Sequence, residues 1–257
     1  VITEVTLKIN PLPRHAMTVI ATYAKLQDAG KAIFQTMSSG ILPSVMEILD
    51  KVTLKSINEN TDLDLPEAEA LILTETDGYT WEEVEAQMEV VLRILKQNNP
   101  SLVKTAKDEK DRLDLWNARK SSYATLARIS NSFVLDDVTV PIARVPELLV
   151  GIQEISQRHG LVVATYGHAG DGNLHPQILY DEYDPEQVEK MEKVEGDLFR
   201  LAVSLNGTLS GEHGIGLSKA NYMTLEHDPV EMALMKQIKR TLDPNNIMNP
   251  GKRALDN

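Results

Sequence analysis

Three of the six histidines in this chain of 257 residues fall in two short glycine-rich segments. The first segment reads YGHAGDGNLHP over residues 166–176 and contains His168 and His175. The second reads SGEHGIG over residues 210–216 and contains Glu212 and His213. Glycine permits positive φ angles and a close approach of the backbone, as a loop that faces a ligand requires. These two segments are therefore the first candidates for a functional site.

The histidines of the first segment can bind one metal ion together with the glutamate of the second. His168 and His175 flank a predicted turn between two strands, so both imidazoles can reach one point. With Glu212 they form an open ligand set for Zn, Mn or Fe(II), which leaves positions for a substrate. His213 can act as a general base near neutral pH. Taken singly, each histidine is more often a turn or packing residue, but their clustering favours a function.

Other kinds of site have less support in the sequence. The glycines of residues 167–172 are spaced G-x-x-G-x-G before a strand, whereas a dinucleotide-binding loop has G-x-G-x-x-G before a helix. The phosphate-binding pattern G-x-x-x-x-G-K-[ST] does not occur. The chain contains no cysteine, which excludes disulfides, iron–sulfur clusters and thiol nucleophiles.

Composition and charge narrow the class of protein. Apolar residues make up 42% and charged residues 25% of the chain, as in ordinary soluble domains. With 26 basic and 38 acidic residues the net charge is −12, which argues against nucleic-acid binding. The chain contains no run of about 18 apolar residues, which is the length that would predict a membrane span. The lack of cysteine fits a cytoplasmic location, which we expect.

The elements that must position these residues alternate between strands and helices, which indicates an α/β or α+β fold. The clearest helix covers about residues 80–97, where Val84, Met88 and Val91 share one face. The expected strands lie near residues 2–9, 17–23, 69–76, 102–107, 133–140, 161–166 and 173–180. The other expected helices lie near residues 26–39, 109–121, 146–160, 184–205, 217–224 and 229–242, and a polar helix ends at about residue 57.

Three segments resemble one known family, in their order and spacing. They read GHAGDGNLH over residues 167–175, GTLSGEHGIG over 207–216 and DPNNIMNPGK over 243–252. They are similar to the C-terminal part of FAD-linked D-2-hydroxyacid oxidases and dehydrogenases of the vanillyl-alcohol-oxidase type, among which are enzymes of glycolate and of D-lactate. The resemblance covers nearly the whole chain.

The resemblance implies a fold and a domain organisation. It implies an α+β fold with a ferredoxin-like antiparallel sheet, helices packed on one face and a C-terminal helical segment. Residues 1–257 would then be the substrate-binding cap domain. The FAD-binding domain of the family precedes this part, so we expect an N-terminal domain outside the chain, which begins directly at Val1.

The resemblance also gives roles to the histidine cluster. His168, His175 and Glu212 match the family's metal ligands, for which Zn and Mn are the candidates. His213 matches the proposed catalytic base.

Four further residues acquire roles in the same way. Arg119, in the segment WNARK, matches the arginine that grips the substrate carboxylate, although residue type alone favours an exposed helix end there. Asn173 matches a polar residue near the substrate. Asn249 and Lys252 match the segment that returns towards the flavin. Some relatives carry a lysine where this chain has VLDD at 134–137, so the preferred substrate is open.

The expected activity is oxidation of a small 2-hydroxy acid, of the glycolate or D-lactate type, to the 2-oxo acid. Hydride would pass to FAD held mainly by the N-terminal domain, so the chain alone should be inactive. That domain and the substrate are the expected partners, and an electron-transfer subunit is a candidate. Two alternatives stay open at this point: a metal-binding module that senses a ligand without redox chemistry, and a stand-alone metal hydrolase.

Overall fold

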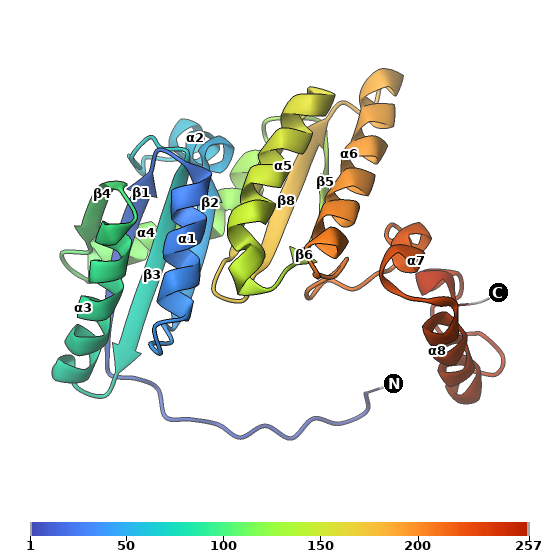
Figure 1. Ribbon diagram of the computed structural model, residues 1–257, viewed down its shortest axis with the longest axis horizontal. Coiled ribbons are helices and arrows are strands. Elements are labelled where there is room, and N and C mark those ends of the chain that lie inside the picture. Colours follow the sequence, from blue (N-terminus) through green and yellow to red (C-terminus); the bar gives the residue numbers. More distant parts are fainter. Residues whose placement is uncertain (1, 256–257) are drawn as a thin grey trace.

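One antiparallel sheet of eight strands runs through the computed structural model, which describes residues 2–255 (Figure 1). The strand order is β4-β1-β3-β2-β7-β8-β5, and β6 pairs with β8 beside β5. The strands are β1 (His15–Tyr23), β2 (Val45–Asp50), β3 (Ala70–Gly78), β4 (Pro100–Thr105), β5 (Ser132–Leu135), β6 (Val138–Thr139), β7 (Val162–His168) and β8 (Asn173–Tyr180).

Five of the eight α-helices in the described part of the chain begin at a residue whose side chain caps them. Thr80 accepts a hydrogen bond from the amide of Glu83 at the start of α3, and Asp228 forms a capping box with Glu231 at the start of α8. Gly160 ends α5 in the left-handed conformation. The helices are α1 (Leu26–Met37), α2 (Lys51–Asn60), α3 (Trp81–Gln97), α4 (Glu109–Leu126), α5 (Val145–His159), α6 (Pro185–Ser204), α7 (Met223–Glu226) and α8 (Pro229–Leu242).

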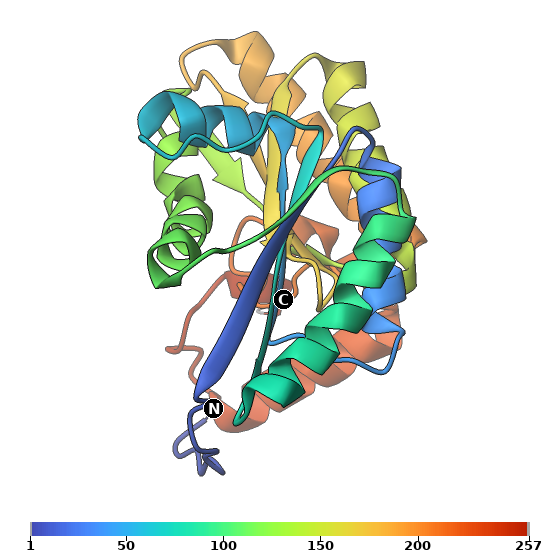
Figure 2. The ribbon, with the colours of Figure 1, turned by 90° about the vertical axis from the view of Figure 1, so that its left-hand side faces the viewer.

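Helices cover both faces of the sheet (Figure 2). On one face, α1, α3, α5 and α6 pack against alternate strand residues such as Val19 and Ala21. On the other, α2 and α4 pack against Ile20 and Leu71. Neighbouring residues of a strand point to opposite faces, so β1 contributes to both cores. The predicted α+β class with an antiparallel sheet is confirmed. The expectation that helices pack on one face only is corrected by α2 and α4.

The sheet consists of two halves of similar topology. In the first, β1-α1-β2-β3-α3-β4 gives the spatial order 4-1-3-2 of a ferredoxin-like unit, with α2 inserted between β2 and β3. In the second, β5-α5-β7-β8-α6 repeats that order without a fourth strand. The halves meet where β2 pairs with β7, through Ile48 with Gly167 and Leu49 with Tyr166.

Four sequence predictions differ from the structure in detail. Residues 2–9 form no strand, because nothing within residues 2–255 pairs with them. The short apolar stretch after Pro43, expected to lead into a polar helix, is the strand β2. Asp50 then caps the helix α2 by accepting from the amide of Thr53 at 2.8 Å. The strand expected at 133–140 is divided into β5 and β6. The helix expected at 217–224 is only a short 3₁₀ turn and α7.

The C-terminal helical segment predicted from the resemblance is present. Beyond α6, the chain forms α7, α8 and a 3₁₀ turn at Lys252–Ala254, and these lie to one side of the sheet (Figure 1). None of the helices within the described part of the chain has the length and hydropathy needed to cross a membrane.

The contact between the two halves can be tested at Gly30 in α1. Gly→Ala inside a helix normally stabilises it by up to about 1 kcal/mol. At Gly30, however, a Cβ atom would lie 2.6 Å from Cα of Pro146, at the start of α5. We therefore expect Gly30→Ala to lower the free energy of unfolding by about 1–2 kcal/mol in urea titrations. The exposed neighbour Lys31→Ala should change it by less than about 0.5 kcal/mol. Stability of Gly30→Ala at or above that of the unsubstituted chain would contradict this packing.

Candidate metal and substrate site

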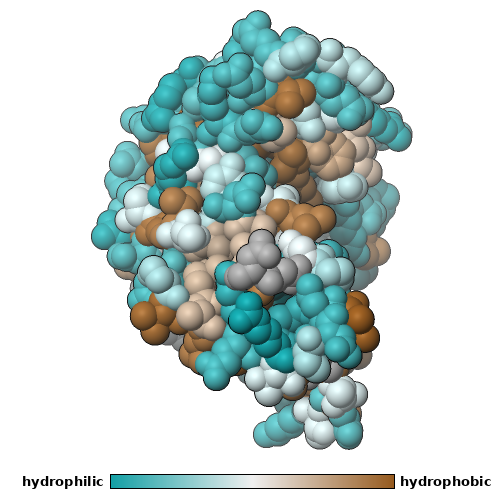
Figure 3. Space-filling view, turned by 90° about the vertical axis from the view of Figure 1, so that its right-hand side faces the viewer, coloured by the Kyte–Doolittle hydropathy of each residue, from teal (hydrophilic) through white to brown (hydrophobic). Residues whose placement is uncertain are grey.

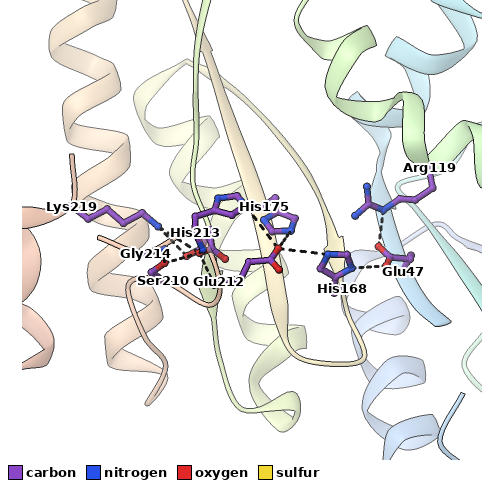
Figure 4. A network of polar contacts seen from close by, with 10 residues as sticks. Glu47, Arg119, His168, His175, Ser210, Glu212, His213, Gly214 and Lys219 are labelled. Carbon is purple, nitrogen blue, oxygen red and sulfur yellow. Dashed lines mark hydrogen bonds and ion pairs between the residues drawn. The ribbon is translucent and has the colours of Figure 1, made fainter. Parts of the chain in front are cut away.

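The predicted histidine cluster forms at the junction of the two halves (Figure 4). His168 ends β7 and His175 lies two residues into β8, on either side of the tight turn that joins these strands. The loop that follows α6 brings Glu212 and His213 to the same point. Sequence positions more than 35 residues apart therefore share one polar network.

The carboxylate of Glu212 lies among three imidazole nitrogens. Its Oε1 atom is 3.3 Å from Nε2 of His175, 3.7 Å from Nε2 of His168 and 3.8 Å from Nε2 of His213. The rings of His168 and His175 are perpendicular, with centroids 5.3 Å apart, whereas those of His175 and His213 are stacked at 5.1 Å. All these nitrogens thus face the same carboxylate oxygen.

The donor atoms fit a divalent metal. One ligand atom from each of His168, His175 and Glu212 lies within 4.8 Å of the other two. Two imidazole nitrogens and a carboxylate suit Zn, Mn or Fe(II). Burial lowers the pKa of His175 to about 4, so its ring is neutral at physiological pH, as a metal ligand must be. A metal ion bound at this point would have these three residues as its ligands.

Glu47, in the middle of β2, joins this cluster to Arg119. Its Oε1 lies 2.6 Å from Nδ1 of His168, and its Oε2 accepts from Nε of Arg119 at 2.6 Å. The hydrogen bond to Glu47 raises the pKa of His168. Sequence reasoning missed Glu47, although a charged residue inside the apolar run VMEILD was a signal for it.

Arg119 points inwards from α4 and not towards solvent. Its guanidinium lies over the ring of Tyr166, 4.9 Å from the centroid. Within residues 2–255, Nε has a partner in Glu47, while the two Nη atoms have no hydrogen-bond partner. Because a guanidinium binds carboxylates in a bidentate way, these free donors suit the carboxylate of a substrate.

The loop that carries Glu212 and His213 is held by Asp137. The Oδ2 atom of this buried aspartate accepts from the amides of Glu212 at 2.9 Å and His213 at 2.8 Å, and from the hydroxyl of Ser210 at 2.7 Å. Burial alone would raise the pKa of Asp137, but these hydrogen bonds lower it overall. Buried Lys219 donates to the carbonyl of Asp137 at 3.1 Å. The sequence showed VLDD at 134–137 where some relatives carry a lysine, but Asp137 was not predicted to anchor this loop.

Asn173 lies beside the same loop, at the start of β8. Its Oδ1 is buried and has no hydrogen-bond partner among the described residues. A Cβ atom at position 211 would lie 2.9 Å from the Asn173 amide group and 2.2 Å from Oγ1 of Thr139, so only glycine fits there. The structure thus brings Asn173 next to the loop of Glu212, with an acceptor left unused.

The C-terminal candidates lie on the far side of this loop. Asn249 and Lys252 line a hollow of about 900 Å³ together with Glu212 and His213. Lys252 donates to Oδ1 of Asn249 at 3.2 Å. All eight residues predicted for the site therefore lie along one continuous region, but only His168, His175, Glu212 and His213 form the compact cluster.

The chain matches the family described as FAD linked oxidases, C-terminal domain, over residues 12–253. It belongs to this family, as the motifs of its sequence suggest. The glycolate oxidase subunit GlcD of Bacillus subtilis is 35% identical over 98% of this chain and 54% of the relative. The mitochondrial D-lactate dehydrogenase [cytochrome] of Arabidopsis thaliana is 34% identical over 98% of this chain and 44% of the relative. The chain therefore spans about half the length of these curated relatives.

Solved structures have the same fold. The structure of p-cresol methylhydroxylase with substrate bound matches with a TM-score of 0.72 over 96% of this chain and 54% of that chain, at 15% identity. The 4-ethylphenol oxidase from Gulosibacter chungangensis, in complex with isoeugenol, matches with a TM-score of 0.69 over 95% of this chain and 54% of that chain, at 18% identity. At such identities the likeness concerns the fold alone.

The buried state of His175 predicts how stability depends on pH. Because its pKa falls from 6.5 to about 4 on folding, the unfolded chain binds more protons between these values. The contribution of His175 is therefore present above about pH 6.5 and is lost as the pH falls towards 4, by roughly 3 kcal/mol. We expect His175→Gln, with chelator present, to show a smaller loss of unfolding free energy over this range than the unsubstituted chain. His227→Gln, outside the cluster, is the control, and an unchanged loss in His175→Gln would contradict the assignment.

Proposed function

We propose that this chain is the substrate-binding part of an FAD-dependent enzyme that oxidises a small 2-hydroxy acid to the 2-oxo acid. The observation that carries the proposal is the connection between two binding groups. Arg119, with free Nη donors, and His168, with its metal-ligand partners, share the carboxylate of Glu47. A small acid with a hydroxyl next to its carboxylate offers groups for both. Membership of the FAD-linked oxidase family favours this function over ligand sensing or metal-dependent hydrolysis.

Each residue of the site would have a distinct task. Arg119 binds the substrate carboxylate through its Nη atoms and so orients the molecule. His213, whose Nε2 lies 3.8 Å from Glu212, takes the proton of the 2-hydroxyl. His168, His175 and Glu212 hold the metal. When bound, the metal would supply Lewis-acid chemistry at the hydroxyl oxygen, and FAD would supply the hydride acceptor for the carbon that carries this hydroxyl.

The FAD-binding half is the partner that this proposal requires. Helix α8 exposes an apolar row, with Val230 76%, Leu234 56%, Ile238 54% and Leu242 56% exposed. This helix lies on the side of the molecule shown in Figure 3, near the hollow lined by Asn249 and Lys252. Since the curated relatives are about twice as long as this chain, we infer that their other half covers such a face. Asn249 and Lys252 would then contact the flavin.

Metal binding by this chain is one test. We expect calorimetric titration with Zn²⁺ or Mn²⁺ to show one site per chain, and His168→Ala to abolish or strongly weaken it because a ligand nitrogen is removed. His227→Ala, outside the cluster, should bind as the unsubstituted chain does. Equal binding by His168→Ala would contradict the ligand assignment.

Flavin reduction by the full-length protein is the second test. Glycolate and D-lactate should bleach the flavin absorbance under anaerobic conditions. His213→Asn should slow this reduction by about 10²–10⁴-fold, as expected for the loss of a general base. Unchanged rates in His213→Asn would contradict its role, and no reduction by any 2-hydroxy acid would contradict the proposed function.

A further inference from the structure

We propose that Glu47 is a positioning residue that sets both the tautomer of His168 and the orientation of Arg119. It would thereby couple the metal site to the binding of the substrate carboxylate by Arg119. The benefit of this coupling rests on the proposed function. The contacts of Glu47 with His168 and Arg119, in contrast, lie within this chain and do not depend on that function. Glu47 belongs to none of the glycine-rich segments and contacts neither the metal ligand Glu212 nor His213 in Figure 4.

The tautomer follows from the chemistry of a carboxylate. An ionised carboxylate can only accept hydrogen bonds, so Nδ1 of His168, 2.6 Å from Oε1 of Glu47, must carry a hydrogen. In a neutral ring, Nε2 then keeps its lone pair. This Nε2 is the atom that faces Glu212, at 3.7 Å. Such a carboxylate behind a metal-binding histidine fixes the ring and makes it a better ligand.

The second carboxylate oxygen of Glu47 binds Arg119 instead of His168. Oε2 accepts from Nε of Arg119 at 2.6 Å, so the guanidinium is held at one edge and its Nη donors stay free. Glu47 is only 7% exposed, and its strand is fixed on both sides, with Glu47 opposite Leu73 of β3 and Ile48 opposite Gly167 of β7. Because the side chain has little room to move, a displacement caused by His168 at Oε1 also displaces Oε2 and its partner Arg119, and the reverse holds too.

Glutamate is the side chain that can do both at this position. Glutamine has nearly the same shape, but only its carbonyl oxygen accepts. Its amide nitrogen would face either the N–H of His168 or the N–H of Arg119, and one of the two hydrogen bonds would be lost. Aspartate is one methylene shorter and would withdraw from both donors.

A second buried glutamate offers a matched control. Glu75, on the neighbouring strand β3, accepts from Nε and Nη2 of Arg112 at 2.8 and 2.9 Å. Arg112 belongs to the same helix α4 as Arg119, so Glu75 also anchors this helix. Glu75 has no contact with the histidine cluster. Glu75→Gln therefore reproduces the loss of a buried ion pair to α4 without touching His168.

The first experiment compares metal affinity in Glu47→Gln, Glu75→Gln and the unsubstituted chain by titration with Mn²⁺ and Zn²⁺. Loss of such an outer partner typically weakens metal binding by about 10–100-fold. We expect this loss in Glu47→Gln and not in Glu75→Gln. Unweakened binding in Glu47→Gln, or an equal loss in both variants, would overturn the proposal.

The second experiment needs no substitution at Glu47 and no metal. The ¹⁵N chemical shifts of the His168 ring in the metal-free chain, assigned with His168→Gln, report its tautomer at a pH where the ring is neutral. The proposal requires the hydrogen on Nδ1, and a hydrogen on Nε2 would overturn it. If the unsubstituted chain binds neither metal, the metal site of the proposed function is wrong, while the tautomer still decides the role of Glu47.

Discussion

Two residue pairs join β2 to β7, Ile48 with Gly167 and Leu49 with Tyr166, and this short junction holds the two halves of the sheet together. The polar network depends on it. Glu47 precedes Ile48 on β2, and His168 follows Gly167 on β7, so the pairing brings their side chains within hydrogen-bonding distance. Gly167 is needed because a Cβ atom there would lie 2.6 Å from the carbonyl oxygen of Asn173. A shift of register by one residue would turn Glu47 to the other face of the sheet.

Adjacent imidazoles in this site experience opposite environments. A hydrogen bond to Glu47 raises the pKa of His168, whereas burial lowers that of His175 to about 4. If the proposed metal binds, protons would oppose it more strongly at the first ring than at the second. Asp137 completes the arrangement, because it fixes the loop of Glu212 through two amides. The carboxylates of Glu47 and Asp137 thus position the residues that would contact the metal or the substrate, without contacting the substrate themselves.

The sequence predicted features that depend on neighbouring residues, such as helices and glycine-rich loops, better than those that depend on the pairing of distant strands. The glycine-rich segments identified the histidine cluster, and the apolar period identified long helices such as α3, because both signals are local. The strand β2 was missed, since six residues with a glutamate among them also suit a helix. Glu47 was therefore not recognised as a partner of the site. Asp137 was missed for another reason, because it lies at the break between β5 and β6 where one continuous strand was expected. The similar topology of the two halves depends on which strands pair, and periodicity does not give strand pairing, so it became apparent only from the strand order.

We propose that the junction of β2 and β7 assembles one metal centre next to Arg119, which would bind the substrate carboxylate. Anomalous diffraction at the manganese edge, from crystals of this chain grown with Mn²⁺ and glycolate, tests it most directly. We expect one strong peak bound by Nε2 of His168, Nε2 of His175 and the carboxylate of Glu212, with the glycolate carboxylate on Arg119. A peak bound elsewhere, or none among these residues at saturating Mn²⁺, would contradict it.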